Sequence, residues 1–206
     1  MEKLDINNFC VAGFLTKPFL KTEYILEKVN FDYNVKIANN PNYTKLESLY
    51  LWIDHVIKFS RDKQFVELNK FNRFASEIWE SGFSVGCSDY AILFATFARQ
   101  LGYPTTILAT AEFNWFSRFK GGDNKRHFGH YFCECFYNGK WVLVDPASRK
   151  LDLNYNPNKK VINLSYCVGD SYKFIPYLRC LDLGKKQNID SHNLEMDMLC
   201  NKIKID

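Results

Sequence analysis

The chain has 206 residues, 47% of them hydrophobic, so we expect a packed core rather than a disordered protein. Lys and Arg outnumber Asp and Glu by 27 to 23, and a net charge of +4 is too small to indicate a nucleic-acid-binding protein. No apolar run approaches the roughly 20 residues that a membrane helix needs. We therefore expect a soluble, cytoplasmic protein without a nucleic-acid or membrane partner. The sequence indicates no oligomeric state.

Two helices are predicted before residue 82. Thr44 and Glu47 have the spacing of a capping box, and the apolar residues of 46–57 then share one helical face. The apolar residues of 71–79 share the face of a second helix, which is predicted to end at Gly82.

A third helix is predicted over 88–101, directly after Gly86 and Cys87, with Gly102 and Pro104 behind it as stop signals. The first backbone N–H groups of a helix have no partner within it and carry the positive end of its dipole. That field favours a thiolate and lowers the pKa of a thiol, and the same N–H groups can hold an oxyanion. Taken alone, a structural cysteine at a helix start is the commoner case.

The second half of the chain is predicted to be extended. Strands are expected over 105–113, 130–137 and 140–145, with a polar loop and candidate lid over 114–129 and further strands within 159–168 and 171–178. Helices followed by antiparallel strands predict an α+β fold. We expect a single domain over 1–206, with a core at about 45–148 and an extension over 149–206.

Asn138-Gly139 predicts a two-residue hairpin turn between two of these strands. The resulting register pairs Phe132 with Asp145 and makes His130 a diagonal neighbour of Asp145. Diagonal neighbours lie roughly 7–8 Å apart, within reach of long side chains. A hydrogen bond from His130 to Asp145 is therefore expected, and it would fix the tautomer of the imidazole.

The same register places Cys133 and Cys135 on the opposite face of the strand from His130. His127, His130 and these two cysteines superficially resemble zinc ligands, but a Cys-x-Cys spacing without a second Cys-x-x-Cys pair is not that of a zinc finger. We expect both cysteines to pack as small apolar residues, and we predict no metal and no cofactor.

Two motifs together resemble the transglutaminase-like superfamily, a group of thiol enzymes related to the papain-like enzymes. The first reads GCSDYAILFATFARQLGYP and the second reads HYFCECFYNGKWVLVDPAS. The matching residues are Gly86, Cys87, Asp89, Ala91, Arg99, Gly102 and Pro104, then His130, Phe132, Glu134, Gly139, Trp141, Asp145 and Pro146. The resemblance covers roughly 45–148 and implies a papain-like or transglutaminase-like core, with the nucleophile at the N-terminus of a central helix.

The resemblance implies acyl transfer from an amide through a Cys-His-Asp triad. Cys87 would attack the carbonyl carbon, His130 would move the proton, and Asp145 would orient His130. A protein or peptide substrate is expected, and the acyl group would pass to water or to an amine. The alternative is a non-catalytic peptide- or protein-binding module on the same fold. The second oxyanion donor stays open, with Trp79, Asn69 and Asn72 as candidates.

Overall fold

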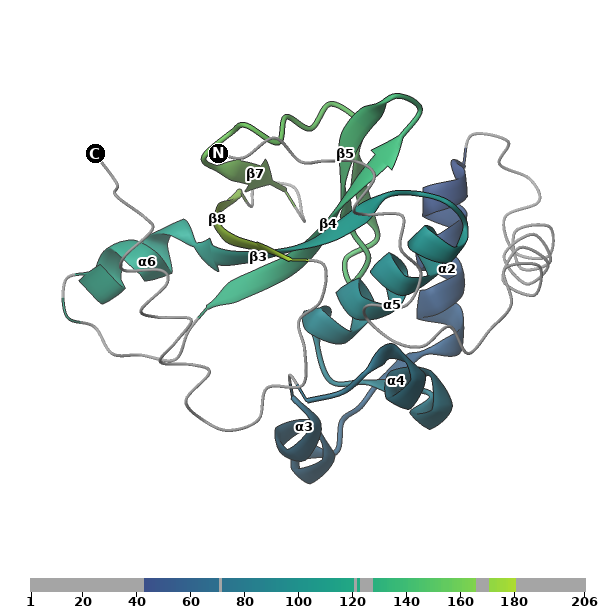
Figure 1. Ribbon diagram of the computed structural model, residues 1–206. Helices are drawn as coiled ribbons and strands as arrows, with labels where there is room; N and C mark the ends of the chain where they lie inside the picture. Colours follow the sequence, from purple (N-terminus) through teal and green to yellow (C-terminus); the bar gives the residue numbers. More distant parts are fainter. Residues whose placement is uncertain (1–42, 71, 121, 123–127, 166–170, 181–206) are drawn as a thin grey trace.

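The computed structural model describes residues 43–70, 72–120, 122, 128–165 and 171–180 (Figure 1). Helices come first and a curled antiparallel sheet follows, so the prediction of an α+β fold is confirmed. The prediction of one domain over 1–206 extends beyond the described residues and stays a prediction.

The helical part begins as the sequence predicts. The predicted capping box is confirmed, because Thr44 accepts the N–H of Glu47 at 3.1 Å and Glu47 accepts the N–H of Thr44 at 2.6 Å. The helices are α2 (Lys45–Val56), α3 (Lys63–Asn69), α4 (Ala75–Ser81) and α5 (Cys87–Gln100).

The second predicted helix begins later than the sequence indicates. Phe74 is the N-cap of α4 and is 37% exposed, so it does not belong to the buried face. Phe71 lies outside the described residues. The helix ends at Gly82, as predicted, with that glycine in the left-handed conformation. The short strands β1 (Lys58–Phe59) and β2 (Phe83–Ser84) form a parallel pair that the sequence did not predict.

Six strands form the main sheet, in the order β6-β5-β4-β3-β8-β7. They are β3 (Thr105–Glu112), β4 (Gly129–Tyr137), β5 (Lys140–Asp145), β6 (Lys150–Asp152), β7 (Ile162–Leu164) and β8 (Tyr172–Cys180). The hairpin register is confirmed, with Tyr137 opposite Lys140, Phe136 opposite Trp141 and Glu134 opposite Leu143.

A helix, α6 (Phe113–Lys120), stands where the sequence predicts the start of a loop. The carboxylate of Glu112 accepts the N–H groups of Asn114 at 3.0 Å and Trp115 at 2.6 Å, which caps the helix start. Trp115 and Phe116 are buried in the core. The first half of the candidate lid is therefore a packed helix.

The helix α5 is the centre of the molecule. Figure 1 shows it between α2 and the sheet, and residues 88–100 are all buried. The main core cluster fills the space between the helices and the sheet, and a smaller cluster covers the other face of the sheet. The smaller cluster is formed by Leu108, Phe132, Leu143, Ile162 and Phe174.

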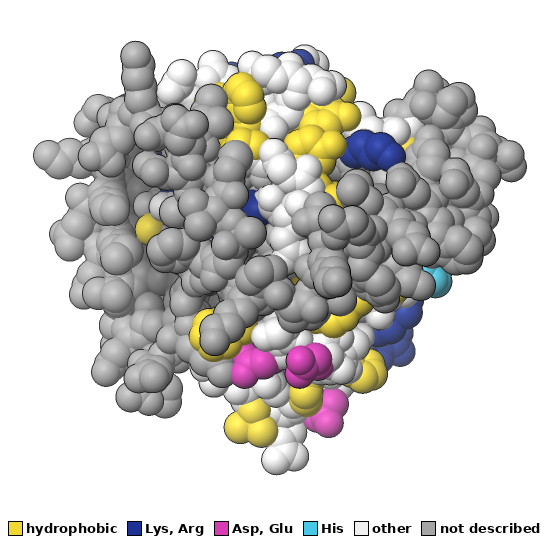
Figure 2. Space-filling model, turned by 45° about the vertical axis from the view of Figure 1, so that its right-hand side comes forward, with side chains coloured by type: hydrophobic (Ala, Val, Ile, Leu, Met, Phe, Trp, Pro, Cys, Tyr) yellow, Lys and Arg dark blue, Asp and Glu magenta, His cyan; other side chains and the backbone are white. Residues whose placement is uncertain are grey.

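Figure 2 shows hydrophobic, basic and acidic side chains on the described part of one face, with the acidic ones gathered in its lower part. Among the described residues, no helix is long and apolar enough to cross a membrane.

Candidate active site

Cys87 is the first residue of α5 and the one residue of that helix that is not fully buried. The N-cap before it is Gly86, which has an extended backbone and no side chain to cap the helix. A Ser or Asp at this position would bond one of the first N–H groups. With glycine there, no side chain caps the helix start, and the N–H of Asp89 donates to the carbonyl of Gly86 at 3.2 Å.

His130 and Asp145 approach each other across the β4–β5 hairpin. His130 Nε2 lies 2.9 Å from Asp145 Oδ1, and the two side chains are 16% and 1% exposed. The same carboxylate oxygen accepts the N–H of Ser148 at 3.0 Å. The backbone after β5 therefore holds the carboxylate in place, and the carboxylate holds the imidazole.

The imidazole of His130 packs between aromatic rings of the smaller core cluster. Its centroid lies 4.7 Å from that of Phe132 and 5.9 Å from that of Phe174. These rings limit the motion of the imidazole. Because Phe174 comes from β8, the extension over 149–206 contributes a side chain to the candidate site.

Cys87 and His130 lie within hydrogen-bonding range. Burial by itself lowers the pKa of His130, but hydrogen bonds to Asp145 and Cys87 and the negative charges of both groups raise it to about 10. Because Nε2 faces Asp145, the other ring nitrogen is the one left to take the thiol proton. The arrangement can form a thiolate–imidazolium pair beside the first turn of a helix.

The three candidate oxyanion donors make contacts with residues other than Cys87. Trp79 packs on Trp52 and Phe97, with ring centroids 5.3 Å apart in each case. Phe97 follows Cys87 by ten positions, or about 15 Å along the helix, so Trp79 lies far from the thiol. The side-chain amide of Asn69 donates to the carbonyl of Phe65 at 2.8 Å, and Asn72 is exposed.

Cys133 and Cys135 lie on the opposite face of β4 from His130, as predicted. Both are fully buried in the cluster beneath α5, and the thiol of Cys133 donates to the carbonyl of Ala91 at 3.4 Å. His127 lies outside the described residues. Among the described residues, no group of three or more His, Cys, Asp or Glu could hold a metal ion.

Sequence reasoning missed two arginines that pair with buried carboxylates. Arg73 pairs with Asp89 in the first turn of α5, and Arg179 pairs with Glu134 in β4. A carboxylate within an otherwise apolar, buried segment requires a cation or several donors. The positions of Asp89 and Glu134 in apolar segments could therefore have indicated that each carboxylate has a cationic partner. The spacing along the chain does not identify which Arg or Lys that partner is.

A comparison with protein families agrees with these motifs. A model of the transglutaminase-like superfamily matches residues 30–146. A crystal structure of a candidate cysteine protease from Cytophaga hutchinsonii resembles the chain with a TM-score of 0.42 and 16% identity, over 70% of this chain. The match spans 43% of the length of that protein. No curated protein matches the chain.

Proposed function

The chain belongs to the transglutaminase-like superfamily, and we propose that it catalyses thiol-dependent acyl transfer from an amide, with Cys87, His130 and Asp145 as its triad. The observation that carries the proposal is the position of His130. It is held against the Asp145 carboxylate at 2.9 Å and is within hydrogen-bonding range of Cys87.

In the proposed reaction, the thiol proton of Cys87 passes to His130, and the sulfur bonds to the carbonyl carbon of the substrate. The carbonyl oxygen becomes an oxyanion beside the first turn of α5. When the intermediate collapses, the C–N bond breaks and the leaving amine takes the proton from His130. A water or an amine then attacks the thioester, gives its proton to His130 and releases the thiolate.

We also propose a peptide or protein as the substrate. Support comes from an exposed aromatic side chain in the segment directly before Cys87. Phe83, in β2 four positions before Cys87, is 47% exposed and offers an apolar contact to a polypeptide. A cytoplasmic location stays a prediction from the sequence.

Alkylation tests the proposal. Iodoacetamide is added to the folded protein at neutral pH, and the modified peptides are followed by mass spectrometry. Cys87 should react at least about tenfold faster than a model thiol, because the thiolate is the reactive form. Cys87→Ala should abolish this fast phase, while Cys133→Ala should leave it unchanged.

The second measurement separates catalysis from binding alone. With p-nitrophenyl acetate as the acyl donor, the folded protein should release p-nitrophenolate in a burst and carry an acetyl group on Cys87. A Cys87 that alkylates no faster than a model thiol and forms no acyl-enzyme would refute the proposal and favour the binding module. Adding glycine methyl ester shows whether the acyl group passes to an amine or to water.

A further inference from the structure

The segment that leads into Cys87 is held by a buried ion pair between Arg73 and Asp89. The two side chains are 4% and 1% exposed. Arg73 precedes α4, and Asp89 lies in the first turn of α5, two residues after the proposed nucleophile. The pair therefore joins the segment before α4 to the start of the helix that carries Cys87.

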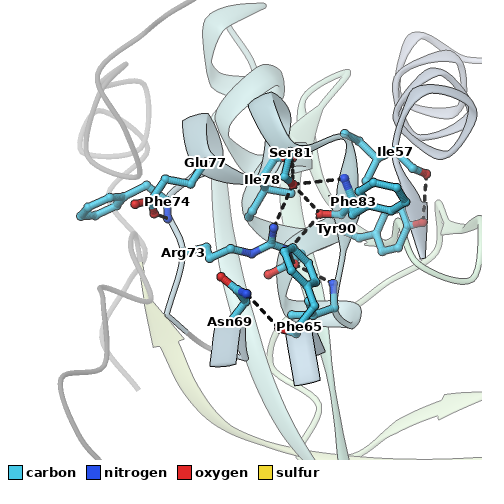
Figure 3. Close-up of polar contacts among 12 residues, drawn as sticks. Ile57, Phe65, Asn69, Arg73, Phe74, Glu77, Ile78, Ser81, Phe83 and Tyr90 are labelled. Atoms are coloured by element: carbon cyan, nitrogen blue, oxygen red, sulfur yellow. Dashed lines mark hydrogen bonds and ion pairs between the residues drawn. The ribbon is translucent and has the colours of Figure 1, made fainter. Parts of the chain in front are cut away.

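Arg73 also binds the segment between α4 and α5. Its Nη1 donates to Ser81 Oγ at 3.0 Å, and its Nη2 donates to the carbonyl of Phe83 at 2.9 Å. Figure 3 shows the guanidinium directed at these groups, with the ring of Phe65 beside it. One side chain thus contacts the end of α4, β2 and the first turn of α5.

Asp89 also binds the chain before the helix. Its carboxylate accepts the N–H of Val85 at 2.8 Å, and Val85 directly precedes the N-cap Gly86. Phe83 and Val85 are thereby fixed on one side of Cys87 and Asp89 on the other side.

Burial raises the pKa of Asp89, and the charge and hydrogen bond of Arg73, with the N–H of Val85, act against that rise. Buried ion pairs of this kind often contribute no more stability than apolar side chains of similar size. A contribution to fold stability therefore explains the presence of this ion pair poorly. Its position two residues from Cys87 points to a role at the proposed active site.

We propose that Arg73, acting through Asp89, positions the N–H groups of the first turn of α5 that stabilise the oxyanion formed when Cys87 attacks. This inference rests on the proposed acyl transfer. Arg73 is a positioning residue, since its own contacts are with Asp89, Ser81 and Phe83 and not with the reacting atoms.

Two reactions of the same sulfur test the inference. Alkylation by iodoacetamide forms an S–C bond and releases iodide without an oxyanion, whereas acylation by p-nitrophenyl acetate passes through one. The double variant Arg73→Met/Asp89→Leu removes the pair without leaving a lone charge. Its acylation rate should fall by about 10²-fold and its alkylation rate by less than about threefold, because only acylation depends on the oxyanion donors.

The matched control is Glu134→Leu/Arg179→Met, which removes the ion pair between β4 and β8. Both of its rates should stay near those of the unmodified protein. If the double variant at Arg73 does not unfold cooperatively in urea, Arg73→Lys takes its place. Lysine keeps the charge but cannot bond Ser81, Phe83 and Asp89 together as the guanidinium does.

The possible failures are distinguishable. Equal losses in acylation and alkylation, or no loss in acylation, would overturn the positioning role and leave the proposed function standing. An unmodified protein that alkylates fast but does not acylate at Cys87 would overturn both proposals.

Discussion

The imidazole of His130 has two partners that favour its protonated form. Burial works against the charge, but the hydrogen bonds and charges of Asp145 and Cys87 prevail and raise its pKa from 6.5 to about 10. Because the pKa in the folded state is the higher one, protonated His130 stabilises the fold. That stabilisation is fully present below about pH 6.5 and is lost as the pH rises through about 10.

Asp145→Asn should lower the pKa of His130 from about 10 towards 6.5, because the amide keeps the shape of the carboxylate but removes its charge. The titration of the His130 ring is measured by NMR on protein with labelled histidine. The ring signals of His55, which is exposed on α2, provide the internal control and should be the same in both proteins. An unchanged titration of His130 would contradict the role assigned to Asp145.

The sequence predicts some contacts between side chains and not others. The proximity of His130 to Asp145 follows from a two-residue turn and the alternation of side chains along two neighbouring strands. The partner of Asp89 cannot be found in this way, because Arg73 lies sixteen positions away, in the segment before α4. Proximity that depends on how separate elements pack is not encoded in a local pattern.

At the level of elements, the β4–β5 hairpin determines the register on which the site depends. Asn138 and Gly139 both have positive φ, at 50° and 81°, as a turn between two twisted strands requires. A shift by one residue would move Asp145 to the other face of the sheet, away from His130. The turn therefore acts on the site although it lies at the far end of both strands.

Gly139→Ala should destabilise the fold by about 1–2 kcal/mol, because a Cβ atom at positive φ lies too close to the carbonyl oxygen that follows it in the chain. Urea unfolding measures this as a lower midpoint with an unchanged slope. Lys140→Ala, at an exposed neighbouring position, is the control and should change the stability by less than about 0.5 kcal/mol. Equal midpoints for the unmodified protein and Gly139→Ala would refute the argument.

The helix α6 shows where local patterns fail. Its sequence, FNWFSRFK, is rich in aromatic residues and is followed by glycines, which are typical of a loop. The helix forms because Glu112, at the end of β3, caps it and because the core takes up Trp115 and Phe116. The burial of Trp115 and Phe116 is a tertiary cause, which propensity does not contain. The cap is local, but Glu is not among the residues that usually cap a helix start.

At the scale of the whole molecule, an ion pair at the buried carboxylate of Glu134 joins two strands that lie on either side of β3. Arg179 Nε in β8 donates to both oxygens of Glu134 in β4, at 3.1 and 2.9 Å, and Tyr155 donates to the same carboxylate. Glu134 is completely buried. The pair ties the extension after residue 149 to the core, which the sequence did not predict.

Arg179→Met should destabilise the fold by about 3 kcal/mol, because it leaves the carboxylate of Glu134 buried without its cation. Adding Glu134→Leu should restore most of that loss, as measured by urea unfolding. Arg149→Met is the control, since its pair with Asp54 spans 3.6 Å and the Arg149 side chain is 58% exposed. That change should cost less than about 1 kcal/mol, and an equal cost at both arginines would contradict the argument from burial.

The thiols beneath α5 provide an internal measure of how often the core opens. Cys133 and Cys135 are completely covered, and burial raises the pKa of Cys135 to about 12, so a reagent reaches them when α5 separates from the sheet. Their labelling rate then reports the free energy of that opening, as amide hydrogen exchange does. Cys87 is partly exposed in the closed molecule, so one time course would record both the reaction of the proposed nucleophile and the opening of the protein around it.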